Sequence, residues 1–240
     1  MPLTWPCGSA GQRRPRHSAV CGRFDTSHLT WADVHEILSS LRTVRTEPIN
    51  DMEPDDDVRP TDPQWVARLE GDDFVLDRMR WGLIPRSYKG RVRPSARGAK
   101  DGFQLTTFNC RSEPFTGEDP KTPWSYKFPF QERRCVAFAS RWYEWTGPQG
   151  ARVKHAFVRA DGRPVIFAGI WDQARTLDEG EVASFTIMTG PSAGVLAEYH
   201  TRAPIVLEAE DLGTWLDPKV DAAPLLKAMR ADRFLVEVAA

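Results

Sequence analysis

The sequence predicts one α+β domain dominated by β-sheet, with mostly antiparallel strands and a few flanking helices. Its 240 residues, 41% of them hydrophobic, suit a single core of ordinary globular composition. Strand-like runs outnumber helical patterns and do not alternate regularly with them, which argues against a βαβ architecture. No repeat period emerges, and no segment approaches the ~18 consecutive apolar residues of a membrane span.

Local signals place the first helix and the strands. Thr30 and Asp33 form a capping pattern ahead of apolar residues at helical spacing, which predicts a helix over residues 31–41. Gly71-Asp72 and Asp161-Gly162 predict hairpin turns between alternating runs. We expect strands over residues 20–24, 64–70, 73–81, 104–109, 134–139, 142–147, 152–159, 164–172, 183–189 and 234–238.

Two loops and three short helical patterns complete the domain. Residues 47–63 hold four prolines among acidic residues and predict an irregular, exposed loop. Residues 86–102 predict a basic loop, because Lys and Arg recur there with no acid before Asp101. Helical patterns are expected near residues 192–198, 208–216 and 222–231.

Residues 1–20 differ from the rest of the chain. They contain three Arg, three Pro, no acid and no apolar periodicity, so we expect them not to join the core. One interpretation is a disordered basic tail that contacts nucleic acid. The other, which we favour, is that translation starts at Val20, read as Met, and that loss of this Met frees the α-amine of Cys21. The folded domain is then 21–240.

The net charge and the cysteine content limit the kinds of binding partner and the cellular compartment that we expect. The net charge of −1 does not indicate a polyanion partner, so any DNA contact needs local clusters of Lys and Arg. Cys7, Cys21, Cys110 and Cys135 form no CxxC pair and match no zinc spacing. We expect a reducing, cytoplasmic setting, no metal, no cofactor and a monomer. Each cysteine, taken alone, also fits a small buried hydrophobe.

Glu144 is the strongest candidate acid. In Trp142-Tyr143-Glu144-Trp145, strand alternation places Glu144 and Trp142 on one face and the other two side chains on the opposite face. A carboxyl beside a large aromatic on a buried face has its ionised form disfavoured, which suits a general acid. The alternative is an edge-strand Glu that reaches water past the aromatic rings.

Three further polar residues close strand-like or helical segments. His200 could transfer protons near neutral pH, or could lie at a helix end and interact with its dipole. Asn109 could orient an amine or carbonyl, or could be a turn residue. Arg111 could bind a phosphate, or could pair with an acid such as Glu113.

Five short motifs in a fixed order resemble the SRAP family, named for SOS-response-associated peptidases. Each motif is weak alone, but together they span residues 20–207. Two departures stand near the site: Arg141-Trp142 replaces the family's usual Gly-Phe, and Ala203 replaces its usual Met. The matching elements are Cys21-Gly22-Arg23; Trp81-Gly82-Leu83-Ile84-Pro85; Asn109, Arg111 and Glu113; Arg134-Cys135 followed by Tyr143-Glu144-Trp145; and His200, Arg202 and Pro204.

The resemblance implies capture of abasic sites in single-stranded DNA. An N-terminal Cys21 would offer an α-amine and a thiol to the lesion's aldehyde, giving a Schiff base and then a thiazolidine. The same resemblance assigns sugar-ring opening to Glu144, proton transfer to His200, with possible strand cleavage, and orientation of the Cys21 amine to Asn109. It also implies autoproteolytic release of the residue before Cys21.

DNA lacking a base must be held through its backbone. The candidates for phosphate contacts are arginines near these motifs, with the 86–100 segment as an extension of the groove. Trp81 and Leu83 are candidates for a wedge or stacking platform. The arginines are Arg23, Arg78, Arg80 and Arg111.

Two other functions fit the same residues. One is a cysteine peptidase that acts on other proteins through Cys21 and His200. The other is a non-catalytic module that binds single-stranded DNA. In every case we expect a cytoplasmic protein, associated with the nucleoid when DNA is bound.

Overall fold

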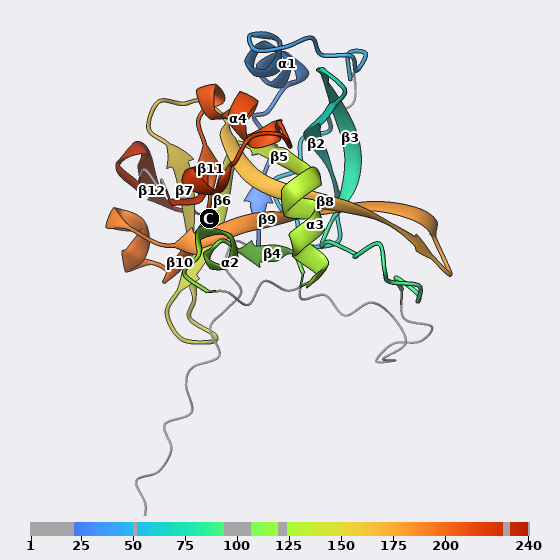
Figure 1. Ribbon diagram of the computed structural model, residues 1–240. Coiled ribbons are helices and arrows are strands. Elements are labelled where there is room, and N and C mark those ends of the chain that lie inside the picture. The colour runs from blue at the N-terminus through green and yellow to red at the C-terminus, as the bar shows by residue number, and fades with distance from the viewer. Residues whose placement is uncertain (1–21, 50–51, 94–106, 120–123, 228–230, 240) are drawn as a thin grey trace, which may run out of the picture.

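The computed structural model describes residues 22–49, 52–93, 107–119, 124–227 and 231–239 (Figure 1). Within them the strands form a 4-stranded sheet in the order β1-β6-β7-β12 and an 8-stranded sheet in the order β10-β9-β3-β2-β5-β8-β11, with β4 on β9. The predicted class, a single sheet-dominated α+β domain, is confirmed. The bounds are β1 Phe24–Asp25, β2 Pro63–Glu70, β3 Asp73–Trp81, β4 Asn109–Arg111, β5 Arg134–Ala139, β6 Arg141–Thr146, β7 Val153–Arg159, β8 Val165–Thr176, β9 Gly180–Pro191, β10 Arg202–Pro204, β11 Val206–Leu207 and β12 Phe234–Val238.

The larger sheet closes on itself. Because β9 pairs with both β3 and β8, the strands β9, β3, β2, β5 and β8 form a closed ring. Pairing is antiparallel except where β3 and β4 run parallel to β9. Closure gives each of these strands one inward and one outward face. The ring is the rigid support on which the site is built.

The helices are short and lie outside the ring (Figure 1). Helix α1 (Trp31–Ser39) has the predicted capping box of Thr30 with Asp33 and buries Val34 and Leu38. The other helices and 3-10 turns are α2 Glu113–Thr116, α3 Trp124–Glu132, α4 Leu212–Leu216, η1 Gly194–Glu198, η2 Ala209–Asp211, η3 Ala223–Lys227 and η4 Ala231–Arg233. No helix in the described part of the chain is long and apolar enough to cross a bilayer.

Several elements differ from the sequence prediction. Helix α3 was not predicted, because Pro129 lies inside it and its apolar residues have little periodicity. Strands β8 and β9 are longer than expected and join in one hairpin. The short strands β10 and β11 were not predicted. The patterns at 192–198 and 222–231 form 3-10 turns where the structure describes them.

Two apolar clusters fill the domain. One lies between the ring and helices α1 and α4, and includes Leu38, Val136 and Trp215. The other joins the ring to the 4-stranded sheet and includes Phe24 and Trp142. Burial of this much apolar surface is the main stabilising term, and it fixes the two sheets against each other.

Arg134, the first residue of β5, ties the C-terminal segment to the ring. Its side chain is 5% exposed and donates to main-chain carbonyl oxygens: Nη1 to Phe130 at 2.9 Å, Nη2 to Val220 at 2.9 Å and to Asp217, and Nε to Trp215. A planar guanidinium with five donors can serve several carbonyls at once. The segment after α4 is therefore held by hydrogen bonds to its backbone.

Candidate functional site

Strand β6 presents Glu144 inward. Trp142, two residues earlier, stacks on Phe157 of β7 with ring centroids 5.0 Å apart. Glu144 is on the same face and only 4% exposed, in a strand paired on both sides. The structure therefore favours the buried carboxyl over the edge-strand alternative.

His155 of β7 lies directly opposite Glu144 in the strand register. It is 9% exposed, and its Nε2 lies 2.7 Å from Oγ1 of Thr146. Opposed residues in an antiparallel pair have Cβ atoms about 4.5–5.5 Å apart, so its ring borders the space of the Glu144 carboxyl. Sequence reasoning missed His155, because nothing local to β7 indicates which residue of β6 it faces.

A chain of contacts leads from His155 to His200. The ring of Tyr199 meets His155 edge to face, with centroids 4.7 Å apart, and also contacts Phe157. His200 follows Tyr199 directly, just after the 3-10 turn η1. The turn that carries His200 is thus packed against β7, the strand that carries His155 and pairs with the strand of Glu144.

Main-chain groups of Arg202 orient the imidazole of His200. The N–H of Arg202 donates to Nδ1 at 3.1 Å, and the carbonyl oxygen of Arg202 is also 3.1 Å from Nδ1. In the neutral ring, Nδ1 accepts from this N–H when the proton is on Nε2, or donates to the carbonyl when the proton is on Nδ1. When the ring is protonated, Nδ1–H can donate to the carbonyl, so both charge states have a partner.

Asn109 begins β4, which runs parallel to β9 in the register Asn109 to Ile187. The preceding residue, Phe108, accepts a 2.9 Å hydrogen bond from the indole N–H of Trp81. Trp81 packs on Phe24 of β1, with ring centroids 4.9 Å apart. These contacts connect the Asn109 segment to the strand that follows Cys21.

Glu113 and Arg202 join two motifs across 89 residues of sequence. The guanidinium binds the carboxylate with both Nη groups, one bond at 2.9 Å, and Nη2 also donates to the carbonyl of Thr189 at 2.6 Å. The hydrogen bond from Arg202 holds the pKa of Glu113 below its usual value. Glu113 therefore pairs with Arg202 and leaves Arg111, the partner considered from sequence, exposed on β4.

Cys21 lies outside the described residues, so the structure is informative only from Gly22 onward. The N–H of Tyr143 donates to the carbonyl of Arg23 at 3.0 Å, and Phe24 pairs with Trp142. The same antiparallel register, continued by two residues, sets Gly22 opposite Glu144. The chain directly after Cys21 thus runs beside the candidate acid.

The two cysteines within the described ranges are both buried and free: Cys110 at 1% and Cys135 at 0% exposed. Burial raises the pKa of both thiols well above the usual range. Since the thiolate is the nucleophile, neither suits nucleophilic catalysis, and both fit small core side chains.

Two of the expected DNA contacts are in the core. Trp81 and Leu83 are each 0% exposed, within the apolar clusters on the two sides of the ring. Trp81 ends β3 and Leu83 lies just after it, and both pack against apolar residues of these clusters. The motif alone did not reveal this burial. In this structure neither side chain is available as a wedge or stacking platform, which corrects that expectation.

The candidate arginines fall into two groups. Arg23 forms an ion pair with Asp57, and Arg80 is half-buried, with Nη1 donating to the carbonyl of Gly82 at 3.0 Å. Burial lowers the pKa of Arg80. Arg78 and Arg111 are exposed. Of these four arginines, Arg78 and Arg111 present their charge to solvent, where a DNA phosphate could reach it.

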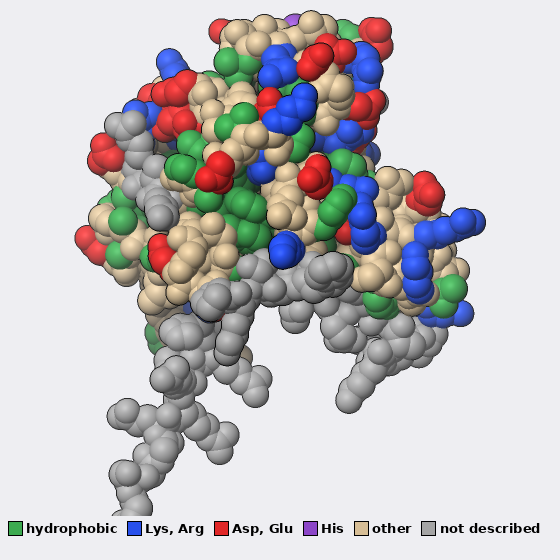
Figure 2. All heavy atoms as spheres, viewed as in Figure 1, with side chains coloured by type: hydrophobic (Ala, Val, Ile, Leu, Met, Phe, Trp, Pro, Cys, Tyr) green, Lys and Arg blue, Asp and Glu red, His purple; other side chains and the backbone are tan. Residues whose placement is uncertain are grey.

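The first part of the basic 86–102 segment is ordered against the β8–β9 hairpin. Asp178 accepts the N–H groups of Val92 and Arg93, at 2.8 and 2.9 Å, and Leu177 donates to Gly90. We call residues 84–93 with the hairpin end 172–184 the arm. Lys and Arg side chains gather on it, at the right of the molecule (Figure 2). Its exposed cations are Arg86, Lys89, Arg91, Arg93 and Arg175.

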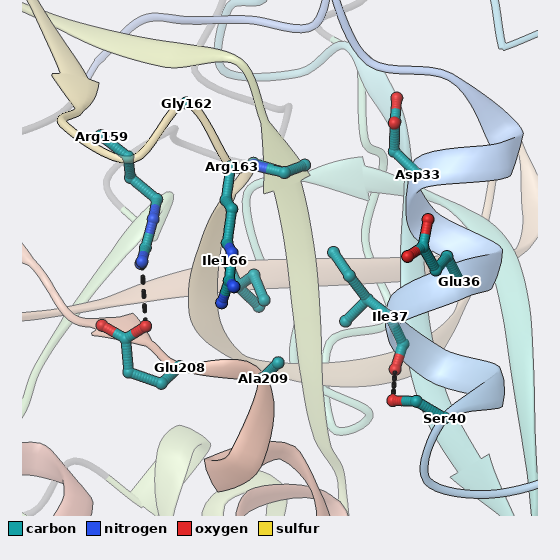
Figure 3. A pocket seen from close by; sticks show the side chains of 11 residues that line it. Asp33, Glu36, Ile37, Ser40, Arg159, Gly162, Arg163, Ile166, Glu208 and Ala209 are labelled. Carbon is teal, nitrogen blue, oxygen red and sulfur yellow. Dashed lines mark hydrogen bonds and ion pairs between the residues drawn. The ribbon is translucent and has the colours of Figure 1, made fainter.

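Three cavities lie elsewhere, and none of these is lined by a predicted site residue. One of about 410 Å³ separates α1 from the turn after β7, where Arg159 binds Glu208 (Figure 3). A second of about 400 Å³ adjoins it, and a third of about 570 Å³ lies beside Arg134. Among the residues that the structure describes, no group of His, Cys, Asp or Glu could hold a metal ion.

Comparisons with known proteins agree with the motifs. A family model described as SOS response associated peptidase (SRAP) matches residues 20–237. The abasic site processing protein YobE of Bacillus subtilis is 26% identical over 207 residues, 83% of this chain and 83% of that protein. The abasic site processing protein HMCES of Pongo abelii is 28% identical over 193 residues, 68% of this chain and 51% of that protein.

Solved structures share the fold. A protein from Bordetella bronchiseptica matches with a TM-score of 0.69 at 22% identity, over 92% of this chain and 100% of that one. A protein from Bacteroides thetaiotaomicron matches with a TM-score of 0.70 at 19% identity, over 92% of each chain. At these identities the likeness concerns the fold alone.

Proposed function

The chain belongs to the family of SOS response associated peptidases, and from this premise we propose that it processes abasic sites in single-stranded DNA. Relatives from bacteria and from a mammal carry the name abasic site processing protein. The observation that carries the proposal is the buried Glu144 carboxyl on β6, beside the residues that directly follow Cys21.

The reaction begins at the first residue of the mature protein, Cys21. Its α-amine, with an ordinary pKa of about 7.7–8.0, is partly neutral at physiological pH and attacks the aldehyde of the lesion. Loss of water gives a Schiff base. The thiol then adds across the C=N bond: a C–S bond forms, the thiol proton passes to nitrogen, and a thiazolidine ring closes. A cysteine within a peptide has no amine and cannot form the imine, so residues before Cys21 must be absent.

Glu144 and His200 move the protons. An abasic sugar exists mostly as a closed hemiacetal, and ring opening needs a proton at the ring oxygen and removal of one from the hydroxyl. Glu144, buried and beside β1, serves as the acid and base for this step. His200, whose Nδ1 is held by the main chain of Arg202, assists proton transfer to the sugar and the Schiff base and supports strand cleavage by β-elimination. Asn109 orients the Cys21 amine.

Backbone phosphates are held by exposed arginines. Arg78 and Arg111 present exposed guanidinium groups. On the arm, Lys89, Arg91 and Arg175 add exposed cations, whereas Arg86 and Arg93 are paired with Asp172 and Glu179. Arg23 and Arg80 contribute less, because each is engaged within the protein. Contacts of this kind bind DNA without reading sequence, as a lesion without a base requires.

A denaturing gel tests the proposal. The chain beginning at Cys21 is mixed with single-stranded DNA that carries one abasic site, beside Cys21→Ala and Cys21→Ser controls and the chain with residues 1–20. We expect a shifted, heat-resistant band only where Cys21 is intact and first in the chain. An adduct with Cys21→Ala, or none with the intact N-terminal cysteine, would contradict the proposal.

The same samples separate the two other functions. A peptidase acting on other proteins would cleave added peptides and would tolerate residues before Cys21. A binding module would retain salt-sensitive DNA affinity after Cys21→Ala and form no adduct in any variant. Release of the residue before Cys21, followed by mass spectrometry, tests the autoproteolytic step.

A further inference from the structure

The outer face of β6 carries a side-chain contact to β1. The hydroxyl of Tyr143 donates to Oδ2 of Asp25 at 2.9 Å. Asp25 is 3% exposed and Tyr143 is 5% exposed, so water does not compete strongly for this bond. We call this pair the Asp25–Tyr143 clamp. It lies on the face of β6 opposite to Glu144.

The clamp is well supported by its surroundings. Oδ1 of Asp25 accepts the N–H and the hydroxyl of Ser27, both at 2.6 Å, which fixes the carboxylate locally. Arg141, which faces Asp25 in the strand register, places Nε 3.3 Å from Oδ2. Oδ1 thus binds within its own turn, whereas Oδ2 faces β6.

The strand that the clamp holds is only two residues long. Main-chain bonds hold it on both edges: the N–H of Ser140 donates to the carbonyl of Asp25 at 2.7 Å, and Phe24 exchanges two bonds with Val58. Because so short a strand has few such bonds, side-chain contacts add to its register. Phe24 anchors it on the inner face by packing against Trp81 and Phe167. On the outer face the clamp joins β1 to β6, one residue away from Glu144.

We propose that Asp25 and Tyr143 are positioning residues that hold the segment after Cys21 in register with the strand that carries Glu144. The inference rests on the proposed function, in which the Cys21 amine and Glu144 act on one sugar. Neither clamp residue touches the substrate. Each acts through the placement of β1, and a displacement of about 1 Å at a reacting centre can lower a rate by about 100-fold.

The clamp is available over the whole working range of pH. Burial and the hydrogen bond to Asp25 raise the pKa of Tyr143 to about 12. The phenol therefore stays protonated and keeps donating wherever the amine of Cys21 is reactive.

The test compares hydrogen bonds to the two oxygens of one carboxylate. Tyr143→Phe removes the bond that crosses between strands, and Ser27→Ala removes a bond of similar length that stays within one turn. All variants are made in the chain that begins at Cys21, the form in which the wild-type protein is expected to form the adduct. Three quantities are measured: the first-order adduct rate at saturating abasic DNA, the Kd for DNA with a non-reactive tetrahydrofuran lesion, and the Tm.

We expect Tyr143→Phe to lower the saturating adduct rate by about 10-fold to 100-fold, with the Kd changed less than twofold. Ser27→Ala should keep an adduct rate within about threefold of wild type, even if its Tm falls as much as that of Tyr143→Phe. Asp25→Asn should resemble Tyr143→Phe, and if it does not fold, the tyrosine variant alone decides. Equal rates for Tyr143→Phe and wild type, or equal losses for Tyr143→Phe and Ser27→Ala, would overturn the inference.

Failure of the proposed function gives a different result. If the wild-type chain forms no adduct at all, the covalent chemistry of Cys21 is wrong. If wild type reacts and Tyr143→Phe reacts as fast, the chemistry stands and the clamp has no positioning role.

Discussion

The two sides of the site are held in different ways. On the side of the closed ring, which we call the barrel side, β4 and β10 are fixed by main-chain pairing to β9, and the Glu113–Arg202 ion pair adds to a register already set. On the sheet side, β1 has only two residues; main-chain bonds to β6 and to Val58 hold it, and the Asp25–Tyr143 clamp adds a side-chain bond. The difference teaches that substitutions in the clamp should change the rate of reaction, whereas substitutions in the Glu113–Arg202 ion pair should change stability.

Loss of the acid on the sheet side should have the largest effect. Glu144→Gln keeps the shape of the side chain but removes its ability to exchange protons. We expect adduct formation to slow by about 10²–10⁴-fold, because general acid–base help is of that size. Single-turnover kinetics measure it, with circular dichroism and Tm as controls. A rate within threefold of wild type would remove Glu144 from the mechanism.

Trp81 joins the two sides, so its loss should damage both. Trp81→Ala removes the indole that packs on Phe24 and the hydrogen bond to Phe108. We expect a loss of about 3–5 kcal/mol in the free energy of unfolding, the usual cost of truncating a buried Trp. Urea unfolding measures it. A stable variant with weakened DNA binding would instead support a stacking role for Trp81 in an altered conformation.

The ion pair on the barrel side should affect stability and its dependence on pH. Glu113→Gln should lower the free energy of unfolding by about 1.5 kcal/mol, since a charge-assisted hydrogen bond is lost. The pKa of Glu113 is depressed in the folded state, so its contribution is complete above the unfolded value of about 4.3 and is lost as pH falls through the folded value. Wild type should therefore lose more stability than Glu113→Gln on acidification from pH 5 to about pH 3. Parallel curves for the two proteins would contradict this.

The smallest expected effect distinguishes exposed from engaged arginines. Arg78→Ala should reduce the slope of log affinity for single-stranded DNA against log salt by about 0.7, one phosphate contact, without changing the Tm. Arg23→Ala, which removes a side chain already paired with Asp57, should leave that slope unchanged. Fluorescence anisotropy at several salt concentrations measures both. Equal slopes in Arg78→Ala and wild type would exclude Arg78 from the DNA path.

Local signals in the sequence predicted much of the fold. The capping pattern of Thr30 and Asp33 and the Gly71-Asp72 turn predicted the first helix and hairpin. Alternation over residues 142–145 predicted that Glu144 shares a face with Trp142. Helix α3 was missed because Pro129 argues against a helix. Tertiary packing stabilises it, including the stacking of Phe130 on Phe115 and its contact with Trp215.

The site was less accessible to sequence reasoning wherever it depends on pairing between distant strands. His155 faces Glu144 only because β6 and β7 have their particular register, and Arg202 selects Glu113 across 89 residues. Trp81 looked like a surface aromatic until closure of the ring put it in the core. Motif order gave the residue types, and long-range pairing decided which of them meet.

Arg134 has a consequence for how this chain can vary. It binds the carbonyls of Trp215, Asp217 and Val220, groups that every amino acid possesses. The side chain of Val220 is thereby released from the task of anchoring its own segment, and substitutions there should leave the attachment intact. The carboxylate of Asp217 has contacts of its own: it lies 3.7 Å from Nη2 of Arg42 and accepts from the N–H of Lys219 at 2.9 Å. The arginine itself has no such freedom, because a lysine at position 134 has one nitrogen and cannot span carbonyls that a guanidinium fork reaches in several directions. The segment after α4 can thus accept substitutions because its attachment depends on a single side chain, Arg134, some eighty residues away in the sequence.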